Sequence, residues 1–214
     1  MVLNRALGRR IAPQLPDIGQ NWKFFPVVDS QTGRTHEPAA VPGGYVFVPA
    51  SLILSARDEA EFAGMLAHSM VHVSERLWAR NSGAIPLVFI GAAGHDEPIL
   101  LPAGLQQAQR SAELEADRLA VAAMARAGYD PAALLTYIDR LQPAATDPNP
   151  LRSAMPSHDE RIAGLQAAIQ ALPPATYSLD NAEFRAVQEE VRRLMPALTD
   201  EWPPTRLPTS LRHK

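Results

Sequence analysis

Cysteine is absent from this chain of 214 residues, which excludes disulfides, thiolate nucleophiles and sulfur-ligated metal sites. Charge of neither sign dominates: 20 basic residues face 23 acidic ones, for a net charge of -3. That balance argues against an extended nucleic-acid surface. Long apolar runs are missing too, since the longest covers the ten residues 84–93 and a membrane-spanning helix needs about 20. We therefore expect no nucleic-acid partner and no transmembrane segment.

What is present suits a folded globular domain, because hydrophobic residues make up 46% of the chain and charged residues 20%. We divide the chain into an N-terminal segment (1–21), a domain (22–195) and a proline-rich tail (196–214), which we expect to be extended. Ile11 and Leu15 are the expected core contacts of the first segment. Arginines near the N-terminus precede no apolar stretch, so we expect no signal peptide. The compartment, bacterial cytoplasm or envelope, and the oligomeric state stay open.

Two short strands are expected. The first, Trp22–Val28, is aromatic and β-branched, and a polar loop follows it as far as Pro42. Two glycines then precede the second strand, which comprises Tyr45, Val46, Phe47 and Val48 and ends at Pro49. Because proline cannot donate to a ladder, we expect this second strand to lie at an edge of the sheet.

Five helices are expected, over about 55–80, 104–127, 131–141, 157–172 and 181–194. Their ends carry capping signals: Ser55 for the first helix, Gly128 after the second, Asp130 before the third, and a Ser157–Glu160 box for the fourth. The expected fold class is α+β and predominantly helical, with a small edge-stranded sheet and two motif-bearing helices.

The chemistry is concentrated on two of these helices. His68 and His72 are four residues apart, so their imidazoles lie one turn apart on one side and can reach one metal ion. Glu113 and Asp117 repeat that spacing on the next helix and can supply a carboxylate ligand and a hydrogen-bond acceptor for an imidazole. Taken separately, the histidines are also compatible with two partly exposed polar residues. The carboxylates are also compatible with a solvated face paired with nearby arginines.

Several segments together resemble the HtpX and CAAX prenyl protease type of zinc metallopeptidase, a branch of the gluzincins. In chain order these segments are Pro42–Val48, Glu61–His68 with His72-Val73, Glu113–Asp117, Ala127–Pro131, Ser157-His158 and Arg161-Ile162. The resemblance covers about residues 42–162. It implies an α+β gluzincin-like domain that binds Zn²⁺ through His68, His72 and Glu113. Asp117 would accept a hydrogen bond from one of the ligand imidazoles.

The resemblance also implies a cleft that takes a peptide or an unfolded protein segment. The expected edge strand at Tyr45–Val48 would line this cleft and pair with the backbone of an extended peptide. Membrane-bound relatives carry a transmembrane hairpin between the two motif helices, and this chain has only its ten-residue apolar run there. It therefore looks like a soluble member.

One position departs from the family pattern. Members carry Glu directly after the first ligand histidine, and this chain has Ser69. That Glu takes the proton from the attacking water and passes it to the leaving amine. A serine hydroxyl is not appreciably basic, so we expect zinc binding to survive and peptide hydrolysis to be impaired or absent. Glu75 and Glu61 are the candidates for a substitute base, but each lies about two turns from His68.

A late pair completes the candidate catalytic residues, which are Ser69, His158 and Arg161. His158 and Arg161 can stabilise an oxyanion, or His158 can become a fourth metal ligand. Alternatively, Ser157 and Glu160 only cap a helix and His158 is exposed. For the whole chain three hypotheses stay open: an active zinc endopeptidase with another base, an inactive relative that binds a peptide or protein, and a structural domain without metal.

Overall fold

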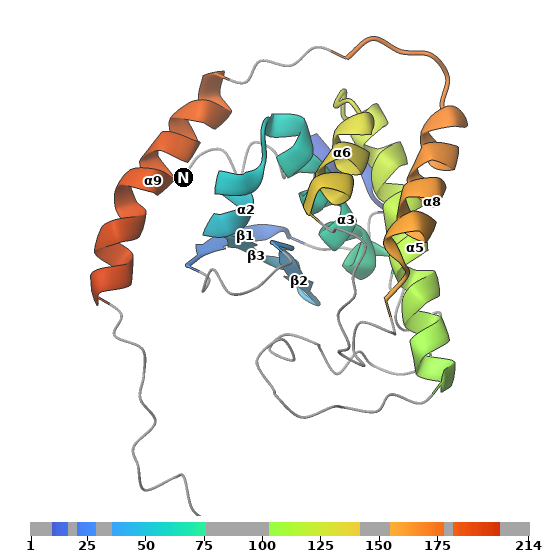
Figure 1. Ribbon diagram of the computed structural model, residues 1–214, viewed down its shortest axis with the longest axis horizontal. Helices are drawn as coiled ribbons and strands as arrows, with labels where there is room; N and C mark the ends of the chain where they lie inside the picture. The colour runs from blue at the N-terminus through green and yellow to red at the C-terminus, as the bar shows by residue number, and fades with distance from the viewer. Residues whose placement is uncertain are drawn as a thin grey trace, which may run out of the picture.

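The computed structural model describes residues 10–16, 21–28, 36–75, 103–141, 155–177 and 182–201. In these ranges the elements are η1 (Ala12–Gln14), β1 (Lys23–Val27), β2 (Ala39–Val41), β3 (Tyr45–Pro49), α2 (Ala50–Ser55), α3 (Glu59–Ser74), α5 (Ala103–Arg126), α6 (Ala132–Leu141), α8 (His158–Gln170) and α9 (Ala182–Glu201). The fold is predominantly helical with one three-stranded sheet (Figure 1). The expected α+β class is confirmed.

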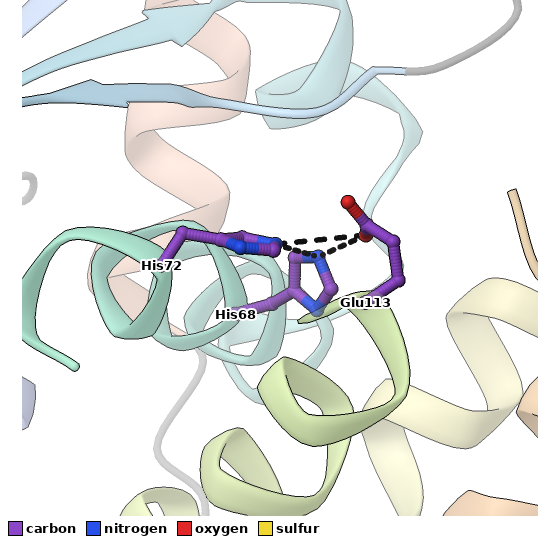
Figure 2. A group of neighbouring side chains, drawn as sticks. All are labelled: His68, His72 and Glu113. Atoms are coloured by element: carbon purple, nitrogen blue, oxygen red, sulfur yellow. Dashed lines mark hydrogen bonds and ion pairs between the residues drawn. The ribbon is translucent and has the colours of Figure 1, made fainter. Parts of the chain in front are cut away.

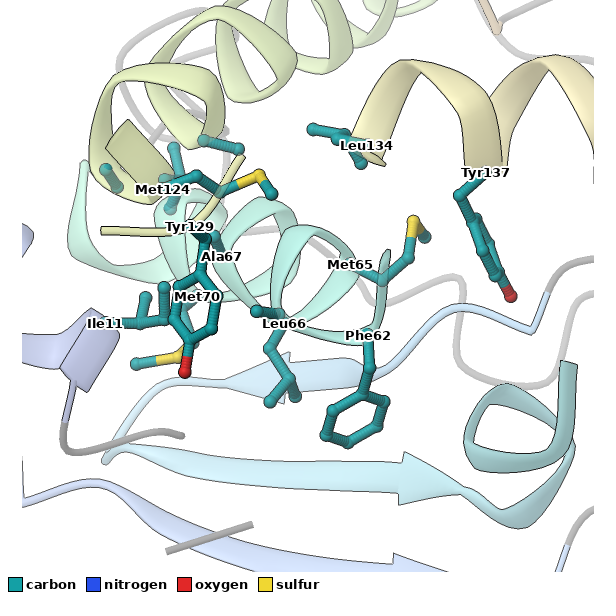
Figure 3. Packing of buried hydrophobic residues seen from close by; sticks show 14 of the residues in the cluster. Ile11, Phe62, Met65, Leu66, Ala67, Met70, Met124, Tyr129, Leu134 and Tyr137 are labelled. Carbon is teal, nitrogen blue, oxygen red and sulfur yellow. The ribbon is translucent and has the colours of Figure 1, made fainter. Parts of the chain in front are cut away.

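Helix α3 forms the centre of the core and is buried on nearly every face. Figure 3 shows Phe62 and Leu66 pointing from α3 towards the sheet, while Met124 and Leu134 approach α3 from its opposite side. α5 and α6 pack against α3, and α8 packs against both of them. This burial holds the side chains of α3 in fixed positions, which a ligand-bearing helix requires.

The sheet differs from the expectation at one decisive point. β3 is its central strand, because β1 pairs with it in parallel and β2 pairs with it antiparallel. The expected edge position of Tyr45–Val48 is therefore wrong. Pro49 is the last residue of β3, where a missing N–H ends the ladder without exposing the strand. β2 itself was missed, since it lies within the expected polar loop.

The start of the first long helix also differs. Residues 50–55 form the separate helix α2, and α3 begins only at Glu59. Asp58 caps α3 by accepting a hydrogen bond from the N–H of Glu61, whereas the hydroxyl of Ser55 contacts Leu52 O and the hydroxyl of Tyr137. α3 ends at Ser74 and a turn follows at Glu75. Residues 76–80, expected to continue the helix, lie outside the described ranges.

The other capping predictions are confirmed. Gly128 has a φ of 83°, a left-handed conformation that favours glycine and ends α5. The carboxylate of Asp130 accepts from the N–H of Ala132 at the start of α6. Ser157 and Glu160 form both bonds of a capping box before α8.

At the two ends of the chain, one expectation holds and one fails. Ile11 and Leu15 are buried in the core, as expected. α9 does not stop at Leu194 but continues through Pro196 to Glu201, although an interior proline removes one helical hydrogen bond and usually kinks or breaks a helix. The outer boundaries of the domain stay predictions. Among the described residues, no helix combines the length and the apolar character that crossing a bilayer requires.

Candidate metal centre

The site begins with two histidines on α3. His68 and His72 lie one turn apart, and their side chains are turned towards the neighbouring helix α5 (Figure 2). His68 is only 3% exposed, so its ring is surrounded by protein atoms and has little contact with solvent.

Helix α5 packs closely against α3. Ala112, Ala116, Ala120 and Ala123 of α5 are fully buried. On α3, a Cβ added to Gly64 would lie 3.2 Å from the Sδ of Met124. This close packing brings Glu113 of α5 opposite the two histidines, and Glu113 is itself 5% exposed.

Three ligand atoms converge between the helices (Figure 2). The Oε2 of Glu113 lies 3.2 Å from the Nε2 of His68 and 3.5 Å from the Nε2 of His72. The two Nε2 atoms are 3.3 Å apart. Zinc bonds of about 2.0–2.1 Å at tetrahedral angles place ligand atoms roughly 3.4 Å from one another. The spacing therefore fits one ion of this size, and His68, His72 and Glu113 can hold it.

Asp117 fixes the orientation of the first histidine. One of its oxygens lies 2.8 Å from the Nδ1 of His68, so Nδ1 carries the proton and Nε2 is turned towards Glu113. Nε2 of the neutral ring and the carboxylate of Glu113 are both acceptors. Atoms of this kind do not face each other at 3.2 Å unless a proton or a cation lies between them.

The charges around the site agree with this arrangement. Burial alone would lower the pKa of His68, but Asp117 and Glu113 outweigh burial and raise it to about 10. Burial would raise the pKa of Glu113, but the two imidazoles hold it well below its usual range. Without a metal, His68 therefore keeps a proton between these acceptors at neutral pH. A divalent cation can take the place of that proton.

Arg161 lies behind Asp117 and is not open to a substrate. It is 1% exposed, and its Nε and Nη2 donate to the two oxygens of Asp117 at 2.8 and 2.7 Å. Its Nη1 lies 3.7 Å from an oxygen of Glu37. Burial opposes the pKa shift of Arg161, but Asp117 and then Glu37 outweigh it and raise that pKa. These contacts differ from the expected oxyanion role, because the guanidinium faces carboxylates.

His158 is not brought to the three ligand atoms. It is the first residue of α8, and its ring nitrogens lie 3.2 Å from oxygens of Asp139 and Asp159. In the part of the chain that the structure describes, the group that can hold a metal comprises His68, His72 and Glu113. The expectation that His158 is a fourth ligand therefore has no support from this geometry.

Ser69 is buried beside His68, but its hydroxyl is turned towards strand β2. It donates to the carbonyl of Pro38 at 2.8 Å and accepts from the N–H of Ala40 at 3.0 Å. The hydroxyl of Ser69, a candidate catalytic residue, is thus bound to backbone groups. Of the two proposed substitute bases, Glu61 is paired with Arg140 at 2.6 Å, and Glu75 lies at the end of α3.

Sequence reasoning missed the segment 37–41, which reaches the site through Glu37 and β2. A strand of two alanines and a valine shows no alternation of polar and apolar residues that could have marked it. The edge strand expected to bind peptide, Tyr45–Val48, has both neighbours in place and cannot accept a third.

Comparison with known proteins places this geometry in a family. Residues 37–169, more than half of the chain, match peptidase family M48. A Vibrio cholerae protein provisionally named beta-barrel assembly-enhancing protease is 30% identical over 191 residues, which cover 78% of this chain and 39% of the relative. The beta-barrel assembly-enhancing proteases of Escherichia coli K12 and Yersinia pestis are 26% and 28% identical over 64% and 63% of this chain, and the matched part is 31% of each relative. The chain thus spans less than half the length of these relatives. It belongs to peptidase family M48.

Proposed function

We propose that this chain is a zinc-binding M48 protein in which peptide hydrolysis is impaired or absent. The observation that carries the proposal is a contrast between two neighbouring residues. His68 points its Nε2 to within 3.2 Å of the Oε2 of Glu113, whereas the next side chain, Ser69, is bound to the backbone of β2. The residues that could hold the ion are present, but position 69 carries no side chain that could take up the proton.

Zinc is the proposed ion because two imidazoles and one carboxylate, at this spacing, are its usual catalytic ligand set. When bound, zinc supplies polarisation of the scissile carbonyl and acidification of the attacking water. His68, His72 and Glu113 would hold it, and Asp117 would keep the His68 ring in the tautomer that ligation needs.

Proton transfer is the step that this chain lacks. The family resemblance assigns it to a Glu at position 69, and a serine hydroxyl is not basic at neutral pH. The neighbouring carboxylates have other tasks: Glu113 is a proposed ligand, and Asp117 is bound to His68 and Arg161. Loss of a general base typically slows such a reaction about 10²–10⁴-fold.

The proposed partner is a peptide or an unfolded protein segment. The relatives are named as proteases that enhance beta-barrel assembly, and an extended chain is the substrate that a protease of any kind must accept. Family membership favours one alternative, an endopeptidase that is active through another base. A non-catalytic peptide-binding module is the other form that the same site could take.

The test compares the natural chain with Ser69→Glu and with Ser69→Gln, which has nearly the size of Glu but cannot take a proton. Bound zinc is measured on each purified protein, and hydrolysis of fluorescent casein is followed with and without a chelator. We expect one zinc per chain in all three proteins and chelator-sensitive hydrolysis in Ser69→Glu alone. Robust chelator-sensitive hydrolysis by the natural chain would refute impaired activity, and absence of zinc would refute the metal site.

A further inference from the structure

Strand β2 has one side paired and one side turned to the metal-bearing helix. Ala39, Ala40 and Val41 pair with Phe47, Val46 and Tyr45 of β3, and β2 also packs against α3. Among the described elements no further strand pairs with β2, so it is an edge of the sheet. The edge that the sequence assigned to β3 therefore belongs to β2.

The outward backbone groups of this edge are bound by one side chain. In an extended strand, residues i and i+2 turn their backbone groups to the same side. Pro38 and Ala40 are such a pair, and both point away from β3 to the hydroxyl of Ser69. A carbonyl and an N–H at this spacing are the groups that an added strand would use for pairing.

A hydroxyl is suited to this position because it donates and accepts at once. Ser69 donates to Pro38 O and accepts from Ala40 N, and its side chain is short enough to hold β2 directly against α3. Because His68 is the preceding residue, the hydrogen bonds of Ser69 lie directly beside the candidate metal ligands on α3.

β2 is connected to the site a second time. Glu37, one residue before Pro38, lies 3.7 Å from Arg161, which binds Asp117 and through it His68. The contacts thus form a closed ring from α3 through β2, α8 and α5 back to α3. Ser69 supplies the hydrogen bonds that join the first two members of this ring.

We infer that Ser69 is a positioning residue that fastens β2 to α3 and closes the outer edge of β2 to an extended peptide beside the metal ligands. The serine at this position therefore has two consequences: it does not supply a base, and it occupies the backbone groups nearest the site. The inference rests on the proposed function in one respect: it takes a peptide as the molecule that would compete with Ser69 for the backbone groups of β2. The hydrogen bonds themselves need neither zinc nor hydrolysis.

The first test measures hydrogen exchange of the Ala40 amide by nuclear magnetic resonance in the natural chain, Ser69→Ala and Ser69→Thr, all without zinc. The amide should be protected in the natural chain, exchange about tenfold faster in Ser69→Ala, and regain protection in Ser69→Thr, which keeps the hydroxyl. Equal exchange in the natural chain and Ser69→Ala would overturn the inference. An unprotected Ala40 amide in the natural chain would overturn it without any variant.

The second test measures closure of the edge as affinity for fluorescein-labelled casein, followed by anisotropy in the presence of a chelator. Ser69→Ala should bind several-fold more tightly than the natural chain, and Ser69→Thr should resemble the natural chain. Equal affinities in all three would contradict closure of the edge. Because zinc is absent, this result is independent of whether the proposed metal site is correct.

Discussion

The carboxylate of Asp117 has two partners at once, the Nδ1 of His68 and the guanidinium of Arg161. Burial would raise its pKa, but Arg161 and then His68 outweigh burial and lower it. Asp117 therefore stays ionised and keeps a proton on Nδ1, so that the Nε2 of His68 is directed to the ligand position. Arg161, which the sequence placed near an oxyanion, acts on this carboxylate instead.

At the residue scale, Glu113→Gln tests the proposed ligand with little change in size. It removes the negative charge from a buried position between two imidazoles. We expect zinc affinity to fall at least by the roughly 10–100-fold that loss of a second-shell partner costs. Glu115→Gln is the control, because Glu115 lies on the same helix and pairs with Arg118. Equal affinities of the two variants, measured by chelator competition, would remove Glu113 from the site.

The raised pKa of His68 gives a pH dependence with a defined sign. Since that pKa is about 10 without metal, the histidine is protonated through the neutral range and zinc must displace the proton. Affinity should therefore rise with pH, by about tenfold per unit. Competition titrations between pH 6.5 and 8.5 measure this slope, and an affinity that does not change with pH would contradict it.

At the element scale, the helices that carry the site and the strands β1 and β3 could be predicted from the sequence, whereas β2 and the order of the strands could not. Local signals are strong on the helices: the capping box at Ser157 and the glycine at 128 act within a few residues. The central place of β3 depends on its parallel pairing with the distant strand β1 and on the neighbouring β2, which the sequence does not mark as a strand. Pro49 suggested an edge instead. The partners of Ser69 are 29 and 31 residues away, and no spacing rule connects them.

Close approach of α3 to its neighbours can be tested at Gly64. A Cβ there would lie 3.0 Å from the Cβ of Leu134 and 3.2 Å from the Sδ of Met124. We expect Gly64→Ala to destabilise the protein, because overpacking costs about 1–3 kcal/mol and exceeds the roughly 0.5–1 kcal/mol that alanine gains in a helix.

Gly164→Ala is the matched control for that substitution. Gly164 lies on α8, and its nearest neighbour would be the Cδ2 of Leu114 at 3.9 Å, so alanine should stabilise the protein slightly. Denaturant unfolding of both variants measures the difference. A Gly64→Ala protein as stable as Gly164→Ala would show that α3 and its neighbours are not closely packed.

At the scale of the whole molecule, the metal centre joins parts that are distant in the chain. His68 and Glu113 belong to separate helices, and Arg161 and Glu37 add α8 and the segment before β2. α9 docks elsewhere, where the side-chain amide of Gln188 donates to carbonyls of Ile53 and Ala56 near the end of α2. An ion at the centre should therefore stabilise the core of the protein as a unit.

Metal removal tests this coupling. Free zinc at 1,000 times its Kd adds about 4.1 kcal/mol to the free energy of unfolding, which corresponds to a rise in Tm on the order of 10 °C. We expect a chelator to abolish this rise in the natural chain and to change the Tm of Glu113→Gln much less. An unchanged Tm of the natural chain, by calorimetry, would mean that the ion does not link these helices.

The most direct measurement is anomalous diffraction from crystals grown with zinc, recorded on both sides of the zinc absorption edge. We expect one peak about 2 Å from each of three atoms, the Nε2 of His68, the Nε2 of His72 and the Oε2 of Glu113. A map with no peak between the two helices, or with an ion that Glu113 does not contact, would contradict the account.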